Sequence, residues 1–370
     1  MNAPRVAFVM ERVLGHATWA LSLRAALASL GVDVVWVETS LYREGGVPER
    51  VPFVPAVARA GVRALLDVRR GLAGQCYDAL LFNTQKAAML CQAYLLRTPT
   101  MLMTDVTPAQ YDRISGPYEH HADEVAPLAA AKRAVNALNF RLARAVIGWS
   151  RWTADSFVRE YGVSRERVHV VPPAVDTREW RPAARPRSLR PRLLFVGGNF
   201  ARKGGPALVE AFHDLGLADR AELHIVTRDE VASQPGVHVH RDMANGSDAL
   251  RELYREADVF VLPTVADCFS IASIEAMAVG LPVIVTDVGG ISDIVVDGET
   301  GFLLRPNDGH GLRAAMAALV DDPDLRGRLG AAARARAVRH FDSRDSARRL
   351  LDIAAAITAR PADAMARRGA

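Results

Sequence analysis

Two short apolar runs with a helix-length segment between them place the strongest constraint on how this chain can fold. Residues Asp258 to Thr264 (DVFVLPT) and Val283 to Thr286 are apolar almost throughout, which is typical of buried strands. Between them, Ser270 suits a helix N-cap and Gly280 suits the position that ends a helix. This order of strand, helix and strand predicts a parallel sheet covered by helices.

Two carboxylates lie in the same stretch. Asp267 precedes the predicted helix and Glu275 lies inside it, with seven residues between them. The free N–H groups at the helix start would attract a phosphate, and a nearby carboxylate can bind the paired hydroxyls of a ribose. The stretch therefore predicts a site for a sugar nucleotide. The plain alternative is an ordinary strand–helix–strand unit whose acids are solvated.

Residues Asp267 to Gly290 resemble the donor-binding segment of the family-four retaining glycosyltransferases. That family has two acidic residues separated by seven, then Glu-Ala-Met-Ala-x-Gly-x-Pro-Val-Ile and a Gly-Gly turn. Here Asp267 stands where Glu is usual, whereas Glu275 to Ile284 (EAMAVGLPVI) and the turn match the motif. The resemblance covers about 190–305 most specifically and 1–175 more loosely. It implies an α/β chain with the GT-B fold, in which two facing Rossmann-like domains each have a parallel sheet covered by helices.

Length and composition agree with this interpretation. The chain has 370 residues, half of them hydrophobic and 24% charged, so two globular domains are expected. The net charge is only +4, and no basic block is interleaved with aromatic residues, so we expect no nucleic-acid partner. Neither a signal peptide nor a run of membrane-spanning length is recognised. We therefore expect a cytoplasmic protein, with the inner membrane surface as an alternative place.

The cysteines and one histidine pair give no metal pattern. Cys76, Cys91 and Cys268 are scattered and odd in number, which fits a reducing compartment with neither a disulfide framework nor a zinc site. His120 and His121 have no third partner at metal-binding spacing, so polar loop residues are predicted there. We expect no metal and no cofactor at the site.

The order of predicted elements also suggests domain boundaries. Residues 177–191 are rich in Pro and Arg and have no apolar period, so we predict a linker. An acceptor-side domain is expected over 1–176 and a nucleotide-sugar-binding domain over 192–342. Over 343–370 the resemblance implies a helix that crosses back to the first domain, followed by a mobile tail.

The first half carries two candidate site positions by this resemblance. The family has a Gly-rich turn after the first strand, where donor phosphates approach, and Gly15-His16 is what remains of it before a helix predicted over Thr18 to Leu30. At the end of a later strand the family places a histidine against the donor sugar, whereas this chain has Asp105. A carboxylate can accept a sugar hydroxyl or favour positive charge at the anomeric carbon, but it donates a hydrogen bond only if its pKa is raised. A loop cap is the alternative role.

The second half carries the predicted diphosphate site. After the strand predicted over Arg192 to Val196, Lys203 matches the family's diphosphate-clamping lysine. The family commonly has an arginine where this chain has Gly198. Arg202 is close enough to take over that charge, and a missing second cation is the alternative. The backbone of Phe269 to Ile271 is expected to line the sugar.

The resemblance implies a retaining, metal-independent, hexosyltransferase-like enzyme. It would move a sugar from a nucleotide diphosphate donor to a hydroxyl of a saccharide, lipid-linked or small-molecule acceptor. Lys203 and Arg202 would neutralise the departing diphosphate, Glu275 would hold the ribose and Asp267 a sugar hydroxyl, with Asp105 as a further catalytic residue. Two alternatives are a sugar-nucleotide epimerase of the same fold and an inactive, sugar-nucleotide-binding partner subunit.

A basic helix adds a membrane hypothesis. Arg59, Arg63 and Arg70 fall on one face of a helix predicted within Pro52 to Leu72. Some relatives that work at membranes use such a helix to bind anionic lipid. A solvated helix packed against the core is the alternative.

Overall fold

The chain divides by its contacts into two compact units. In the computed structural model the described residues are 5–11, 14–40, 46, 56–114, 116–118, 126–183 and 190–359. The first unit takes in 1–115, 121–172 and 344–370, and the second takes in 116–120 and 173–343. His120, His121 and residues 184–189 of the predicted linker lie outside the described residues.

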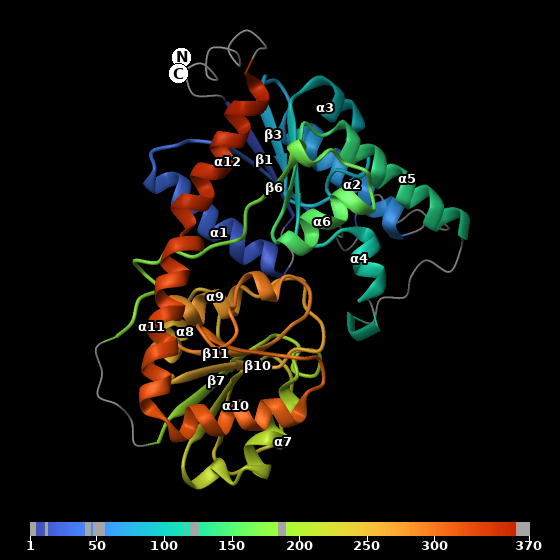
Figure 1. Cartoon of the computed structure of the whole chain (residues 1–370). Coiled ribbons are helices and arrows are strands. Elements are labelled where there is room, and N and C mark those ends of the chain that lie inside the picture. Colours follow the sequence, from blue (N-terminus) through green and yellow to red (C-terminus); the bar gives the residue numbers. More distant parts are fainter. Residues whose placement is uncertain are drawn as a thin grey trace. The chain divides into compact units, whose positions relative to one another are not determined.

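The first unit contains a six-stranded parallel sheet with the order β2-β1-β3-β4-β5-β6. Its strands are β1 (Val6–Glu11), β2 (Val35–Thr39), β3 (Ala79–Phe82), β4 (Thr100–Thr104), β5 (Ala145–Gly148) and β6 (Val168–Val170). Its helices are α1 (Leu14–Ser29), α2 (Ala56–Gly71), α3 (Gln92–Arg97), α4 (Pro108–Arg113), α5 (Ala126–Leu142), α6 (Arg151–Arg159) and α12 (Ser343–Thr358). Helix α1 lies on one side of the sheet, and α2, α3 and α5 lie on the other (Figure 1).

Burial explains why these segments form this layered unit. Strands β1, β3, β4 and β5 are buried at every residue, as expected for parallel strands covered on both faces. On the α2 side, Val68, Phe82, Phe140 and Phe157 belong to one hydrophobic core. The rings of Phe140 and Phe157 pack edge to face with centroids 4.9 Å apart, an arrangement that aromatic pairs favour.

The second unit repeats the architecture with the strand order β12-β11-β10-β7-β8-β9. Its strands are β7 (Arg192–Val196), β8 (Glu222–Val226), β9 (Val237–His240), β10 (Val259–Leu262), β11 (Val283–Thr286) and β12 (Gly301–Leu304). Its helices are α7 (Gly205–Asp214), α8 (Asp248–Glu256), α9 (Ile271–Ala278), α10 (Gly309–Asp321) and α11 (Pro323–His340). Helices α8 and α9 lie on one side of the sheet, and α7 and α10 on the other (Figure 1).

The strand–helix–strand unit predicted in this half is present as β10, α9 and β11. Ser270 is the N-cap of α9, and its hydroxyl accepts a hydrogen bond from the Ser273 N–H at 3.2 Å. Gly280 follows the helix with a φ of 84°, in the left-handed region that glycine adopts readily. The predicted α/β class, with two parallel sheets covered by helices, is confirmed.

Helix α2 corrects one expectation. The helix forms, but Arg63 is only 6% exposed, and Arg59 is half-buried while Arg70 is exposed. The membrane hypothesis needs this basic face at the surface, and at Arg63 the structure does not provide it, because that side of the helix turns into the protein. None of the helices in the described part of the chain combines the length and hydropathy that a membrane span needs.

Candidate active site

Two loops at the carboxyl ends of β10 and β11 pack directly against each other in the second unit. The Gly290 N–H donates a hydrogen bond to the Cys268 carbonyl at 2.9 Å. Gly289 has a φ of 58°, and a Cβ at this position would lie 2.2 Å from the Asp267 carbonyl oxygen. Only glycine allows this approach, so the Gly-Gly turn holds the loop that carries Asp267.

Lys203 and Asp267 form an ion pair within this unit. Lys203 lies in the loop between β7 and α7, and its Nζ donates a hydrogen bond to Asp267 Oδ2. Their side chains are 15% and 9% exposed. The next residue, Gly204, has a φ of 79°, and a Cβ there would lie 1.9 Å from the Pro263 carbonyl oxygen. The lysine predicted to bind the diphosphate and the carboxylate predicted to bind the sugar therefore neutralise each other's charge.

Arg202 lies beside the same acidic loop. Its guanidinium donates to the Ala266 carbonyl at 2.7 Å and lies over the Tyr118 ring, 4.3 Å from the centroid. Its own carbonyl accepts from the Val265 N–H at 2.9 Å. Gly198, by contrast, is exposed, and a Cβ there would meet no atom within 4 Å. The positive charge near the loop that carries Asp267 thus comes from Arg202 and Lys203.

The start of α9 completes this group. Phe269 and Ser270 are buried and Ile271 is half-buried. The Ser270 cap uses the Ser273 N–H, whereas the first N–H groups of a helix have no acceptor within the helix. A helix start with its partial positive charge, next to a lysine, is a suitable place for an anion.

Glu275 lies one helical turn further along and is 6% exposed. The Tyr254 hydroxyl, from α8, donates to its Oε2 at 3.0 Å. Burial raises the pKa of the Glu275 carboxyl to about 7, against the opposing effects of that hydrogen bond and of Arg251. The carboxyl therefore changes its charge near neutral pH.

In the first unit the structure brings His16 and Asp105 together. Helix α1 begins at Leu14, so Gly15 and His16 belong to its first turn and not to a turn before it, which corrects the predicted helix start. His16 Nε2 lies 3.4 Å from Asp105 Oδ1, directly after β4. Burial would raise the pKa of the Asp105 carboxyl, but the His16 imidazole and then Lys86 hold it below its ordinary value. A lowered pKa leaves the carboxyl ionised at neutral pH.

His16 has an open hydrogen-bonding atom. Its ring packs against Trp149 with centroids 4.5 Å apart, and the residue is 9% exposed. Among the described residues, nothing accepts from or donates to His16 Nδ1, which is buried. Buried polar atoms are nearly always paired, so His16 Nδ1 stands out as an unsatisfied buried atom beside Asp105.

Sequence reasoning missed a second carboxylate at the same end of the sheet. Glu11, the last residue of β1, is 3% exposed and accepts a hydrogen bond from the Thr84 hydroxyl at 2.6 Å. Its N–H donates to the Asn83 Oδ1 at 2.7 Å. A carboxylate directly after a buried apolar run was the signal that could have identified it.

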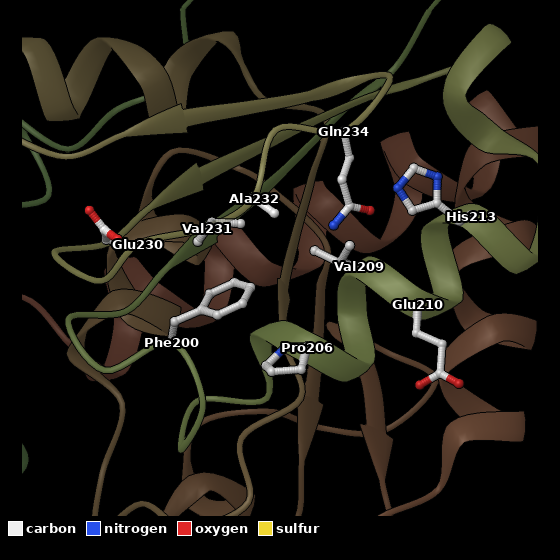
Figure 2. A pocket seen from close by; sticks show the side chains of 9 residues that line it. All are labelled: Phe200, Pro206, Val209, Glu210, His213, Glu230, Val231, Ala232 and Gln234. Carbon is white, nitrogen blue, oxygen red and sulfur yellow. The ribbon is translucent and has the colours of Figure 1, made fainter.

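A separate cavity of about 380 Å³ lies in the second unit between α7 and the segment after β8. Phe200, Val209 and Val231 line it with apolar groups, and Glu210 and Glu230 lie at its margin (Figure 2). None of the described residues that line this cavity is a lysine or an arginine. It therefore lacks the charge that a diphosphate needs, and the candidate site is the group around Lys203.

Two family models of known proteins match this chain, one over each half. The family model described as Glycosyltransferase Family 4 matches residues 13–179, and the one described as Glycosyl transferases group 1 matches residues 190–322. A D-inositol 3-phosphate glycosyltransferase of Xylanimonas cellulosilytica is 32% identical over 243 residues, which cover 58% of each chain. An alpha-maltose-1-phosphate synthase of Mycobacterium tuberculosis is 35% identical over 243 residues, 57% of this chain and 62% of that protein. The match thus spans less than two thirds of either relative.

Solved structures agree on the fold. Sucrose-phosphate synthase from Thermosynechococcus elongatus superposes with a TM-score of 0.72 at 19% identity, covering 94% of this chain and 97% of the other. Anabaena HepE in complex with UDP-glucose gives 0.67 at 16% identity, with 95% and 100% covered. At such identities the likeness concerns the fold, and it confirms two Rossmann-like domains of the GT-B type.

The contact under Gly289 yields a stability prediction with an internal control. Gly298 has a φ of 71°, and a Cβ there would meet nothing within 4 Å. Gly298→Ala should therefore cost only the left-handed conformation, about 1–2 kcal/mol. Gly289→Ala adds a backbone clash with Asp267 and should lose about 1–3 kcal/mol more. Urea unfolding of both variants measures the difference, and equal losses would contradict the packing argument.

Proposed function

Both halves of this chain match glycosyltransferase families, family four among them, and we propose that it transfers a sugar from a nucleotide diphosphate sugar to an acceptor hydroxyl with retention of configuration. The observation that carries the proposal is the group formed by Lys203, Arg202, Asp267 and the start of α9. Cations and free N–H groups suit a diphosphate, and the carboxylate suits a sugar hydroxyl. The acceptor is a saccharide, a lipid-linked group or a small molecule.

Leaving-group stabilisation supplies most of the rate in this proposal. As the bond between sugar and oxygen breaks, negative charge grows on the departing diphosphate. Lys203, Arg202 and the helix start before Ile271 neutralise that charge without a metal ion. One donor placed where charge develops is worth roughly 10²–10³ in rate.

Donor binding would exchange one ion pair for two interactions. In the protein alone, Lys203 is paired with Asp267. The diphosphate takes over the ammonium group of Lys203, which frees Asp267 to accept a hydrogen bond from a sugar hydroxyl. The pair thus keeps two largely buried charges compensated until the donor arrives.

Glu275 is assigned to the ribose. It is a buried carboxylate close after the helix start, and an ionised carboxylate accepts both ribose hydroxyls better than a neutral one does. Tyr254 already donates to one oxygen and thereby fixes the orientation of the carboxylate.

His16 and Asp105 would act on the donor sugar. The family has a histidine at the position of Asp105, and a histidine can donate a hydrogen bond, whereas the ionised Asp105 cannot. The neighbouring His16 supplies an imidazole, and the contact of 3.4 Å between them lets Asp105 orient it. In the family's mechanism the acceptor attacks on the face of the leaving group, whose diphosphate takes the proton, and we propose the same course here.

Removing the charge of Lys203 tests the proposed function. Nucleotide sugars are screened first by thermal shift and then for turnover, which separates an enzyme from a protein that only binds its donor. Lys203→Met should lower turnover by about 10²–10³ and weaken nucleoside diphosphate binding by roughly 1.5–3 kcal/mol. Asp267→Asn is the matched variant: it frees Lys203, so affinity for the free diphosphate should stay or rise while nucleotide sugar turnover falls. Unchanged turnover in Lys203→Met would refute the assignment.

Glu275 predicts a pH dependence of donor affinity. Its pKa of about 7 means that the ribose-binding carboxylate is mostly protonated at pH 6 and mostly ionised at pH 8. Affinity for a nucleotide sugar, whose diphosphate does not titrate in this range, should rise about tenfold between these values. Calorimetry of the wild type and of Glu275→Gln measures this, and the variant should show a weak affinity that does not change with pH.

The raised pKa of the Glu275 carboxyl also predicts how the free energy of unfolding depends on pH. Because the folded pKa is raised from 4.5 to about 7, the unfolded chain releases this proton first as the pH rises. The carboxyl therefore lowers stability progressively between about pH 4.5 and 7, and Glu275→Gln should gain most over the wild type at pH 8. A gain that is the same at pH 5 and pH 8 would contradict the raised pKa.

The contact between His16 and Asp105 predicts that losses of turnover in variants of the two residues do not add. Asp105→Asn keeps size and hydrogen-bonding capacity but removes the charge, and His16→Gln removes the imidazole. If Asp105 acts through His16, both single variants should lose turnover and the double variant little more, with nucleoside diphosphate affinity unchanged. Fully additive losses would show that the two side chains act independently, and near-normal activity of both single variants would reduce Asp105 to a loop cap.

A further inference from the structure

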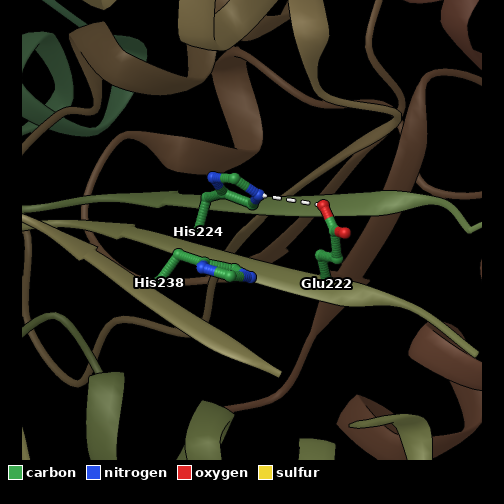
Figure 3. A group of neighbouring side chains, drawn as sticks. All are labelled: Glu222, His224 and His238. Atoms are coloured by element: carbon green, nitrogen blue, oxygen red, sulfur yellow. Dashed lines mark hydrogen bonds and ion pairs between the residues drawn. The ribbon is translucent and has the colours of Figure 1, made fainter. Parts of the chain in front are cut away.

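A group of histidines with one glutamate lies on the edge of the second sheet, away from every residue assigned above. Strand β9 is the edge strand and pairs with β8, and His224 lies directly opposite His238 in that register. Glu222 is two residues before His224, so its side chain points to the same face of β8. Figure 3 shows the three side chains gathered on these neighbouring strands.

The spacing of the ligand atoms suits a small cation. His224 Nε2 lies 3.4 Å from Glu222 Oε2. Two ligands of a tetrahedral zinc ion, each about 2.1 Å from the metal, lie roughly 3.4 Å from each other. One atom each from Glu222, His224 and His238 falls within 4.8 Å of the other two. His238 is exposed, so its ring can turn by the small amount that full coordination needs.

The surroundings prepare these side chains as ligands. His224 Nδ1 lies 3.1 Å from His240 Nε2, which fixes the ring through its second nitrogen as metal-binding histidines require. Arg192 donates to the same oxygen, Glu222 Oε2, at 3.1 Å and holds the carboxylate in place.

We propose that Glu222, His224 and His238 bind a divalent transition-metal ion, with Zn²⁺ as the expected occupant and water at the remaining position. Two imidazoles and one carboxylate are a donor set typical of zinc. The ion would join β8 to the edge strand β9 and so stabilise the outer part of the second sheet. It shares no residue with the Lys203–Asp267 group and has no part in the proposed transfer reaction.

The test uses the full chain without a histidine tag, stripped of metal by a chelator and dialysed. Zinc chloride is titrated against a chromophoric competing chelator, and thermal unfolding is recorded with and without zinc. We expect one equivalent per chain, bound with a dissociation constant in the micromolar range or tighter, and a rise in Tm with zinc concentration because only the folded chain holds the site. Absence of stoichiometric binding would overturn the proposal.

Variants separate this site from other histidines. His238→Ala changes an exposed side chain, so folding should be kept, and zinc affinity should fall about tenfold or more. Glu222→Gln should act in the same direction. The double variant His120→Ala, His121→Ala removes the adjacent pair in the sequence and should bind zinc as the wild type does. Normal binding by His238→Ala, or a loss confined to the double variant, would refute the assignment.

Discussion

Parallel pairing of the strands is the constraint on which both candidate site groups depend. In a parallel sheet the carboxyl ends of all strands lie at the same end of the sheet. The loops and helix starts that follow these strands are therefore neighbours. In the second unit this places Lys203 after β7 and Asp267 after β10 in direct contact. In the first unit it places His16, at the start of α1, beside Asp105 after β4. Residues that are far apart in the chain are thereby in direct contact.

The two pairs have different electrostatic characters, and each fits a different task. The charges of Lys203 and Asp267 neutralise each other. In the proposed donor site a bound diphosphate would take over Lys203 and leave Asp267 for the sugar, so binding of the two parts of the donor is linked. Asp105 stays ionised beside His16 and can hold the imidazole in a fixed orientation, while His16 Nδ1 has no hydrogen-bond partner among the described residues. Glu275 differs from both, because burial leaves its charge dependent on pH near neutrality.

The histidine group on β8 and β9 lies apart from this chemistry. It involves the starts and middles of the strands rather than the residues that follow their carboxyl ends. An edge strand has a neighbour on only one side, so a cross-strand metal would add stability where the sheet has least support. Such a role is compatible with a transfer reaction that uses no metal at the diphosphate.

The sequence by itself determined the elements whose signals are local. The strands β10 and β11 and the helix α9 followed from apolar runs, the Ser270 cap and Gly280, because each signal acts within a few residues of its own position. Tertiary structure alone decided the pairing of Lys203 with Asp267, 64 positions apart, and the burial of Arg63. It also decided the position of His16, since α1 begins earlier than its apolar stripe indicated. The grouping of Glu222, His224 and His238 could not be predicted either, because it depends on which residues of two separate strands lie opposite each other.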